Sequence, residues 1–126
     1  MNLRTPLSNV RGLGSAKEGT DHFWKQRVTA VANVVLISFM VFSLITHVGA
    51  DYQTVKAYLS SPIVAVLMMM LVLSGIAHMR LGMQVVIEDY VHSEGRKIVL
   101  LLLNNFFSLF VGLICIYAVL KLSFGA

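Results

Sequence analysis

The fold is decided by one apolar stretch, SPIVAVLMMMLVLSGIAHM, which runs from Ser61 to Met79. It has 17 uncharged residues after Pro62, and its opening Ser-Pro pair is typical of a helix N-terminus. The helical pattern continues to Tyr90, so a helix over 62–90 would be roughly 43 Å long at about 1.5 Å per residue. A hydrocarbon core is only about 30 Å thick. The stretch therefore predicts a transmembrane helix whose C-terminal end emerges among the lipid headgroups.

Two further apolar segments flank this helix, with 21 uncharged residues over 28–48 and 23 over 98–120. Both are long enough to cross a bilayer as helices. We therefore predict an all-α membrane protein with three transmembrane helices, spanning approximately 28–48, 62–90 and 98–120. Residues 1–27 form a polar tail, and residues 28–126 form the membrane anchor domain. We expect a short loop over residues 49–61.

The composition excludes a water-soluble domain. Of the 126 residues, 57% are hydrophobic and 13% are charged, whereas a soluble domain carries about 25% charged residues. The basic residues flank the apolar segments without interleaved aromatic residues, which disfavours nucleic-acid binding. No short apolar stretch ends in a small-residue cleavage site, so we expect no signal peptide. Cys115 is the single cysteine, which excludes an internal disulfide and favours a small buried apolar side chain.

The distribution of lysine and arginine predicts the orientation. The tail holds five of the ten basic residues, and Arg80, Arg96 and Lys97 place three more on the same side of the membrane. The opposite side has only Lys56 and Lys121. Because basic residues concentrate in cytoplasmic segments, we expect the N-terminus in the cytoplasm and the C-terminus in the periplasm. The predicted location is the bacterial cytoplasmic (inner) membrane, crossed several times.

His78 is the first candidate for a functional residue. It lies about 24 Å along the second helix from Pro62, and an ionisable side chain inside a span is a functional hypothesis by default. Imidazole is also the usual axial ligand of b-type haem iron. Ser74, Gly75 and Gly82 share its helical face and would leave a flat recess. A histidine hydrogen-bonded to a neighbouring helix, or one on a proton path, fits the residue types equally well, and small residues also serve helix packing.

Asp89 and Tyr90 lie roughly 16–18 Å further along the same helix. A phenol near the membrane surface can donate a hydrogen bond to a quinone carbonyl, and a carboxylate can accept or relay protons. An interfacial anchor and a solvated end-of-helix charge are the alternatives. Arg80 and Arg27 could pair with haem propionates, or could reach the phospholipid headgroups.

A longer motif carries a family resemblance. His78-Met79-Arg80-Leu81-Gly82-Met83-Gln84-Val85-Val86-Ile87-Glu88-Asp89-Tyr90 resembles the motif of the succinate dehydrogenase hydrophobic membrane anchor, the smaller of two anchor subunits. Arg27-Val28-Thr29-Ala30 resembles the opening of that family's first helix. The resemblance implies that His78 is one axial ligand of haem b, and that a sister anchor subunit supplies the other in a shared helix bundle. It also implies that Tyr90 donates to ubiquinone with Asp89 nearby, and that Arg27 lies near the propionates or the quinone.

The implied function is that of a succinate dehydrogenase membrane anchor, which is not catalytic alone. Electrons would pass from succinate to ubiquinone in the tricarboxylic acid cycle and respiratory chain, through FAD and iron–sulfur clusters held by the flavoprotein and iron–sulfur partner subunits. The chain itself has no dinucleotide fingerprint and no cysteine cluster. His22, His47 and His92 do not occupy the family's ligand position. The alternatives are a fumarate reductase anchor and a structural three-helix scaffold without cofactor.

Overall fold

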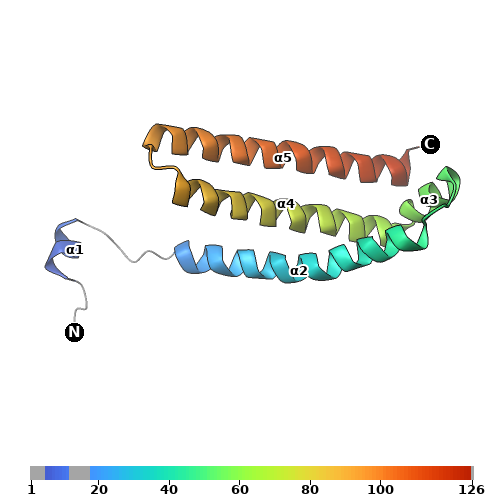
Figure 1. The fold of residues 1–126 in the computed structure, drawn as a ribbon, viewed down its shortest axis with the longest axis horizontal. Coiled ribbons are helices and arrows are strands. Elements are labelled where there is room, and N and C mark those ends of the chain that lie inside the picture. Colours follow the sequence, from blue (N-terminus) through green and yellow to red (C-terminus); the bar gives the residue numbers. More distant parts are fainter. Residues whose placement is uncertain (1–4, 12–17, 126) are drawn as a thin grey trace.

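The computed structural model of the chain describes residues 5–11 and 18–125, which contain helices and no strand. The helices are α1 (Pro6–Val10), α2 (Glu18–Thr46), α3 (Tyr52–Leu59), α4 (Pro62–Tyr90) and α5 (Glu94–Phe124) (Figure 1). Three of them, α2, α4 and α5, are long and apolar enough to cross a membrane. The prediction of an all-α protein with three spans is confirmed.

The long helices extend beyond the uncharged segments from which they were predicted. α4 has the bounds expected from the sequence. α2 begins at Glu18, inside the segment assigned to the polar tail, and α5 runs from Glu94 to Phe124. An uncharged run marks the hydrocarbon layer, whereas the backbone hydrogen bonds of a helix continue through the headgroup region. Residues 1–4 and 12–17 of the predicted tail lie outside the described residues.

The connection between α2 and α4 is not the simple loop expected from the sequence, because it contains the two-turn helix α3. Asp51 caps this helix by accepting a hydrogen bond from the Thr54 backbone N–H at 3.2 Å. Hydrogen bonds from Thr54, first from its side chain and then from its backbone, lower the pKa of Asp51. A lowered pKa means that the cap stabilises the folded state when ionised and is lost as the pH falls through that pKa. Tyr58 fixes α3 against α2, since its hydroxyl lies 2.7 Å from the buried Ser43 Oγ.

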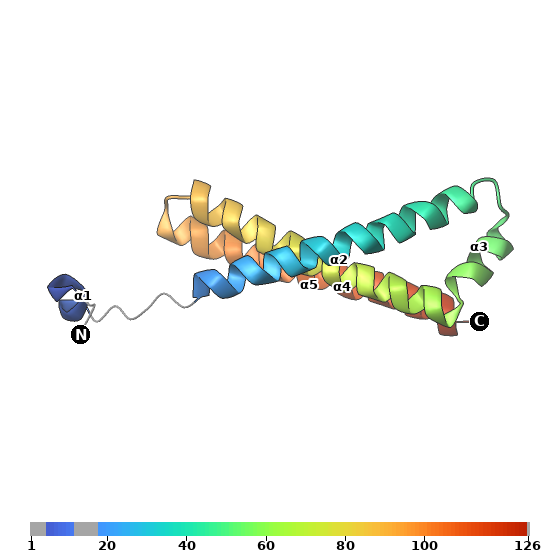
Figure 2. The ribbon, with the colours of Figure 1, turned by 90° about the horizontal axis from the view of Figure 1, so that it is seen from below.

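The three long helices form one layer with α4 in the middle. α4 packs against both α2 and α5 (Figure 1), and α2 crosses α4 at an angle (Figure 2). Few apolar side chains are buried in this layer: Leu36, Val64, Ala65 and Ile87. Large side chains such as Phe106 are mostly exposed. Both faces of the layer are therefore suited to contact with lipid or with other subunits.

Small and polar residues line the contact between α4 and α5. Asn104, Ser108 and Gly112 follow one another at four-residue intervals on α5, and all three are buried. Asn104 Nδ2 donates a hydrogen bond of 3.0 Å to the Arg80 carbonyl, and a Cβ at Gly112 would lie 3.6 Å from the Ile76 side chain. Small residues at such spacing let two helices approach closely where no hydrophobic force drives them together.

Replacement of Asn104 by alanine tests this packing. Asn104→Ala removes the donor to the Arg80 carbonyl and leaves a gap in the contact, so we expect the free energy of unfolding to fall by about 1–2 kcal/mol. Helicity during titration of mild-detergent micelles with sodium dodecyl sulfate measures this loss. Asn105→Ala removes the same group from an exposed position, where its hydrogen bond with Arg80 Nε lies at the surface, and should cost less. A larger loss for Asn105→Ala would contradict the packing described here.

Candidate functional site

His78 lies on α4 at the contact with α2, where one hydrogen bond fixes its imidazole. Its Nδ1 is 3.1 Å from Thr29 Oγ1. The Thr29 hydroxyl also lies 2.9 Å from the Lys25 carbonyl and 3.1 Å from the Gln26 carbonyl, to which it donates its single hydrogen. In the other tautomer the hydroxyl would donate to Nδ1. With that hydrogen on a carbonyl, Thr29 Oγ1 accepts the hydrogen bond from His78 Nδ1–H. This assignment leaves Nε2 as the ring nitrogen with a free lone pair.

The side chain of His78 is half-buried and lines a groove of about 380 Å³ between α2 and α4, which we call the histidine groove. Its other walls include Phe23, Arg27, Ala30 and Val85. Nε2 makes no hydrogen bond with the described residues. A neutral imidazole with an unengaged Nε2 is the usual form of a histidine that binds a metal ion.

Arg27 supplies a positive charge to the same groove. Its Cζ lies 5.0 Å from the centre of the Phe23 ring, a cation–π contact that orients the guanidinium. The one salt bridge among the described residues joins Lys25 to Asp21, so no carboxylate in this part of the chain neutralises Arg27. The histidine groove therefore combines an electron-pair donor with an unpaired cation. This combination suits a metal-containing group that carries carboxylates.

The small residues around His78 serve mainly to bring α2 close. Ser74 Oγ donates a hydrogen bond of 3.3 Å to the Thr29 carbonyl, and a Cβ at Gly82 would lie 3.4 Å from Gln26 Nε2. Residues four positions from His78 share the side of α4 that faces α2, which explains both contacts. A Cβ at Gly75 would meet nothing within 4 Å. The sequence predicted a recess at Ser74, Gly75 and Gly82. Only Gly75 has open space beside it.

Asp89 and Tyr90 lie at the end of α4 and are not brought next to His78. Both side chains are exposed, Tyr90 to 78%, and neither makes a hydrogen bond with the described residues. Along the helix they are about 16–18 Å from His78. These two residues are accessible to a ligand or to another subunit, and they do not belong to the histidine groove.

Two neighbours of this groove were not predicted as site residues. Thr29 occurs in the Arg27–Ala30 segment that carried part of the resemblance, but a hydroxyl inside a span usually indicates helix packing. His22 lines the groove as well, and its Nε2 is buried without a hydrogen-bond partner in the described part of the chain. No signal in the sequence distinguished His22 from an ordinary polar residue of the tail.

The described residues do not form a complete metal site. No group of three or more His, Cys, Asp or Glu side chains that could hold a metal ion occurs within residues 5–11 and 18–125. Any metal bound at His78 would need further ligands from outside these segments or from a cofactor.

The sequence matches the family model described as succinate dehydrogenase/fumarate reductase transmembrane subunit, over residues 1–114. It is 31% identical over 126 residues to the succinate dehydrogenase hydrophobic membrane anchor subunit of Paracoccus denitrificans, covering 100% of this chain and 97% of that protein. It is 29% identical over 107 residues to the subunit of the same name from Rickettsia bellii, covering 85% and 86% of the two chains. The succinate dehydrogenase membrane anchor subunit of Reclinomonas americana is 34% identical over 86 residues, covering 66% and 72%. No solved structure matches the chain.

Proposed function

The chain belongs to the family of succinate dehydrogenase/fumarate reductase transmembrane subunits, and we propose that it binds haem b and contributes to the ubiquinone-reduction site of a succinate dehydrogenase. It is a multi-pass protein of the bacterial inner membrane with the role of a membrane anchor. Its partners in the complex are a flavoprotein and an iron–sulfur subunit, which carry the FAD and the iron–sulfur clusters. A sister anchor subunit completes the membrane part in this proposal.

The observation that carries the haem proposal is the distance of 3.1 Å between His78 Nδ1 and Thr29 Oγ1, a hydrogen bond in which we propose that Nδ1–H is the donor. It leaves the lone pair of Nε2 free to bind iron as an axial ligand, and it holds the ring in one orientation. Arg27 would neutralise the carboxylates of the bound group, because it lines the same groove and has no carboxylate partner in residues 5–11 and 18–125. When bound, the haem would supply one-electron redox chemistry. The second axial ligand would come from the sister anchor subunit.

Tyr90 and Asp89 carry the proposed quinone site. The Tyr90 hydroxyl would donate a hydrogen bond to a carbonyl of the ubiquinone head group, and the Asp89 carboxylate would accept or relay protons. Both side chains are exposed at the end of α4, so a pocket around the quinone would need walls from neighbouring subunits. With the N-terminus in the cytoplasm, as the basic residues predict, ubiquinone is reduced at the cytoplasmic face.

Two other functions agree with part of these observations. The family description includes fumarate reductase, and the direction of electron flow depends on the potential of the native quinone. A scaffold without cofactor would also place His78 in a hydrogen bond to a neighbouring helix. The free Nε2 beside an unpaired arginine favours the haem proposal over the scaffold.

Removal of the imidazole tests haem ligation. We expect His78→Ala to abolish the haem b band in the reduced-minus-oxidised optical spectrum of the purified complex, because it removes the Nε2 that would bind the iron. His92→Ala, at an exposed histidine in the turn before α5, should leave the band unchanged. A normal haem b band in His78→Ala would reject His78 as the ligand.

Replacement of Thr29 tests how the ligand is oriented. Thr29→Val keeps the shape of the side chain but removes the acceptor for His78 Nδ1–H, so we expect roughly 10–100-fold weaker haem retention. Haem content per complex during detergent washing measures this loss. Thr29→Ser keeps the hydroxyl and should retain the haem like the unaltered complex. Equal retention by Thr29→Val and Thr29→Ser would show that the hydrogen bond does not matter.

The quinone site is tested at the phenol of Tyr90. We expect Tyr90→Phe to lower ubiquinone reductase activity about two- to tenfold, the range for loss of one hydrogen bond. Succinate oxidation with an artificial acceptor dye should persist. Tyr52→Phe, at the exposed tyrosine that begins α3, should change neither activity. An equal loss of both activities in Tyr90→Phe would indicate an assembly defect and contradict a direct role.

A further inference from the structure

Arg80 is a cation at membrane depth that the proposed haem and quinone sites do not use. It lies two residues after His78, about 200° around the helix, and it lines both a groove against α5 and a further groove against α2 that Asp21 and Thr29 also line. The hydrogen bond between His78 and Thr29 sets the relative depth of the antiparallel helices α4 and α2. Arg80 then lies level with Arg27, where the uncharged span of α2 begins. This is the depth at which headgroups meet the hydrocarbon.

The guanidinium of Arg80 has no negatively charged partner in the described part of the chain. Its Nε donates a hydrogen bond of 2.6 Å to Asn105 Oδ1, which is uncharged. The single salt bridge among these residues joins Lys25 and Asp21. A cation at the edge of a low-dielectric layer is stabilised by a counter-charge. Arg80 therefore presents a free anion-binding group, and the Asn105 amide NH₂ adds a second donor beside it.

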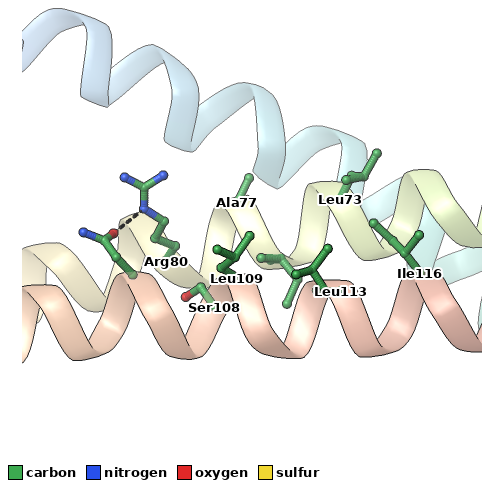
Figure 3. Close-up of a pocket in the computed structure, with 10 residues that line it drawn as sticks. Leu73, Ala77, Arg80, Ser108, Leu109, Leu113 and Ile116 are labelled. Carbon is green, nitrogen blue, oxygen red and sulfur yellow. Dashed lines mark hydrogen bonds between the residues drawn. The ribbon is translucent and has the colours of Figure 1, made fainter.

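An apolar groove of about 450 Å³ begins at Arg80 and follows the contact between α4 and α5 (Figure 3). On α5 its wall continues through Leu109, Leu113 and Ile116, and Leu73 lies on the α4 side. From Asn105 to Ile116 the groove is about 16 Å long at the rise of a helix. One leaflet of a bilayer has about 15 Å of hydrocarbon, half of the 30 Å core. The groove thus has the length of one acyl chain.

Ser108 lies between the charged end and the apolar part of this groove. It is 1% exposed, lines the groove, and its Oγ has no hydrogen-bond partner among the described residues. A buried hydroxyl without a partner is costly, so a rotation of this side chain toward the groove would let it donate to an acceptor on a ligand. The Asn105 amide of α5 lies beside the Arg80 guanidinium of α4. The Ser108 hydroxyl lies about one turn deeper along α5, and apolar side chains follow it. A phospholipid has the matching order of phosphate, ester carbonyl and acyl chain.

We propose that the groove between α4 and α5 is a binding site for one anionic phospholipid. The phosphate binds Arg80 and the Asn105 amide, the ester carbonyl accepts a hydrogen bond from Ser108 Oγ, and the acyl chain lies along Leu109 and Leu113. The lipid belongs to the leaflet on the Arg80 side of the membrane. A helix of another subunit fits this groove less well, since it would have to bring a carboxylate to Arg80 at membrane depth.

Native mass spectrometry of the purified complex tests this site, with phosphatidylglycerol as the probe. We expect the unaltered complex to retain one tightly bound phosphatidylglycerol and the Arg80→Gln complex to lose it. The affinity of the Arg80→Gln complex for phosphatidylglycerol should be about tenfold lower, as for loss of a charged hydrogen bond. Phosphatidylcholine with the same acyl chains should bind the unaltered complex more weakly. Arg96→Gln removes the same charge from an exposed position near the start of α5, outside the groove, and should retain the lipid.

Equal retention of phosphatidylglycerol by Arg80→Gln and the unaltered complex would overturn the proposal, as would equal affinity for phosphatidylcholine. If Arg80→Gln does not assemble, Ser108→Ala provides the measurement, because it removes only one oxygen atom. The affinity of the Ser108→Ala complex for phosphatidylglycerol should fall two- to threefold, within the range for a neutral hydrogen bond. An unchanged affinity would count against the site. A disulfide cross-link from Leu113→Cys to another polypeptide would show that protein covers the groove, and would also overturn the proposal.

Discussion

The need to pair every polar group inside the bilayer governs this structure. The contact between Thr29 and His78 satisfies that need on both sides, because a hydroxyl and an imidazole that would be costly in lipid bond to each other. The same contact fixes the relative depth of α2 and α4 and selects the ring nitrogen that stays free. Arg27 takes its place relative to His78 from this alignment, whereas Asp89 and Tyr90 are placed by α4 itself. A structural hydrogen bond and a metal-binding role are therefore compatible in one histidine, since each uses a different nitrogen.

The sequence predicted the three spans and the bounds of α4 because Pro62 starts that helix and the apolar run is uninterrupted. It did not predict that α2 begins at Glu18 or that Tyr52–Leu59 is helical, because charge patterns report membrane depth and not helix ends. His78 and Arg27 line one groove, and the expectation from the resemblance that Arg27 lies near the haem propionates or the quinone stays a prediction. Thr29 could not be identified as the partner of His78, since the two lie 49 positions apart and their contact depends on how α2 crosses α4.

Because α4 lies between α2 and α5, different sides of α4 contact different helices. One side carries His78 beside α2, and another carries Arg80 beside α5. A separation of two residues produces this difference, because it rotates the position of the side chain by about 200° around the helix axis. A motif with His-x-Arg therefore does not imply a shared ligand. In this fold the imidazole lines the histidine groove, whereas the guanidinium lines the groove against α5 and a further groove against α2.

The near absence of a buried core has a consequence for how the cell handles this chain. Because α4 separates α2 from α5 and few side chains are enclosed, the layer gains little by folding alone. An unassembled copy would leave the groups of His22, Gln26 and Asn33 that lack hydrogen-bond partners among the described residues within the membrane region or at its edge. We expect such a copy to be marginally stable and accessible to membrane proteases, which act on locally opened helices. The amount of this subunit would then depend on the supply of the subunits that cover it.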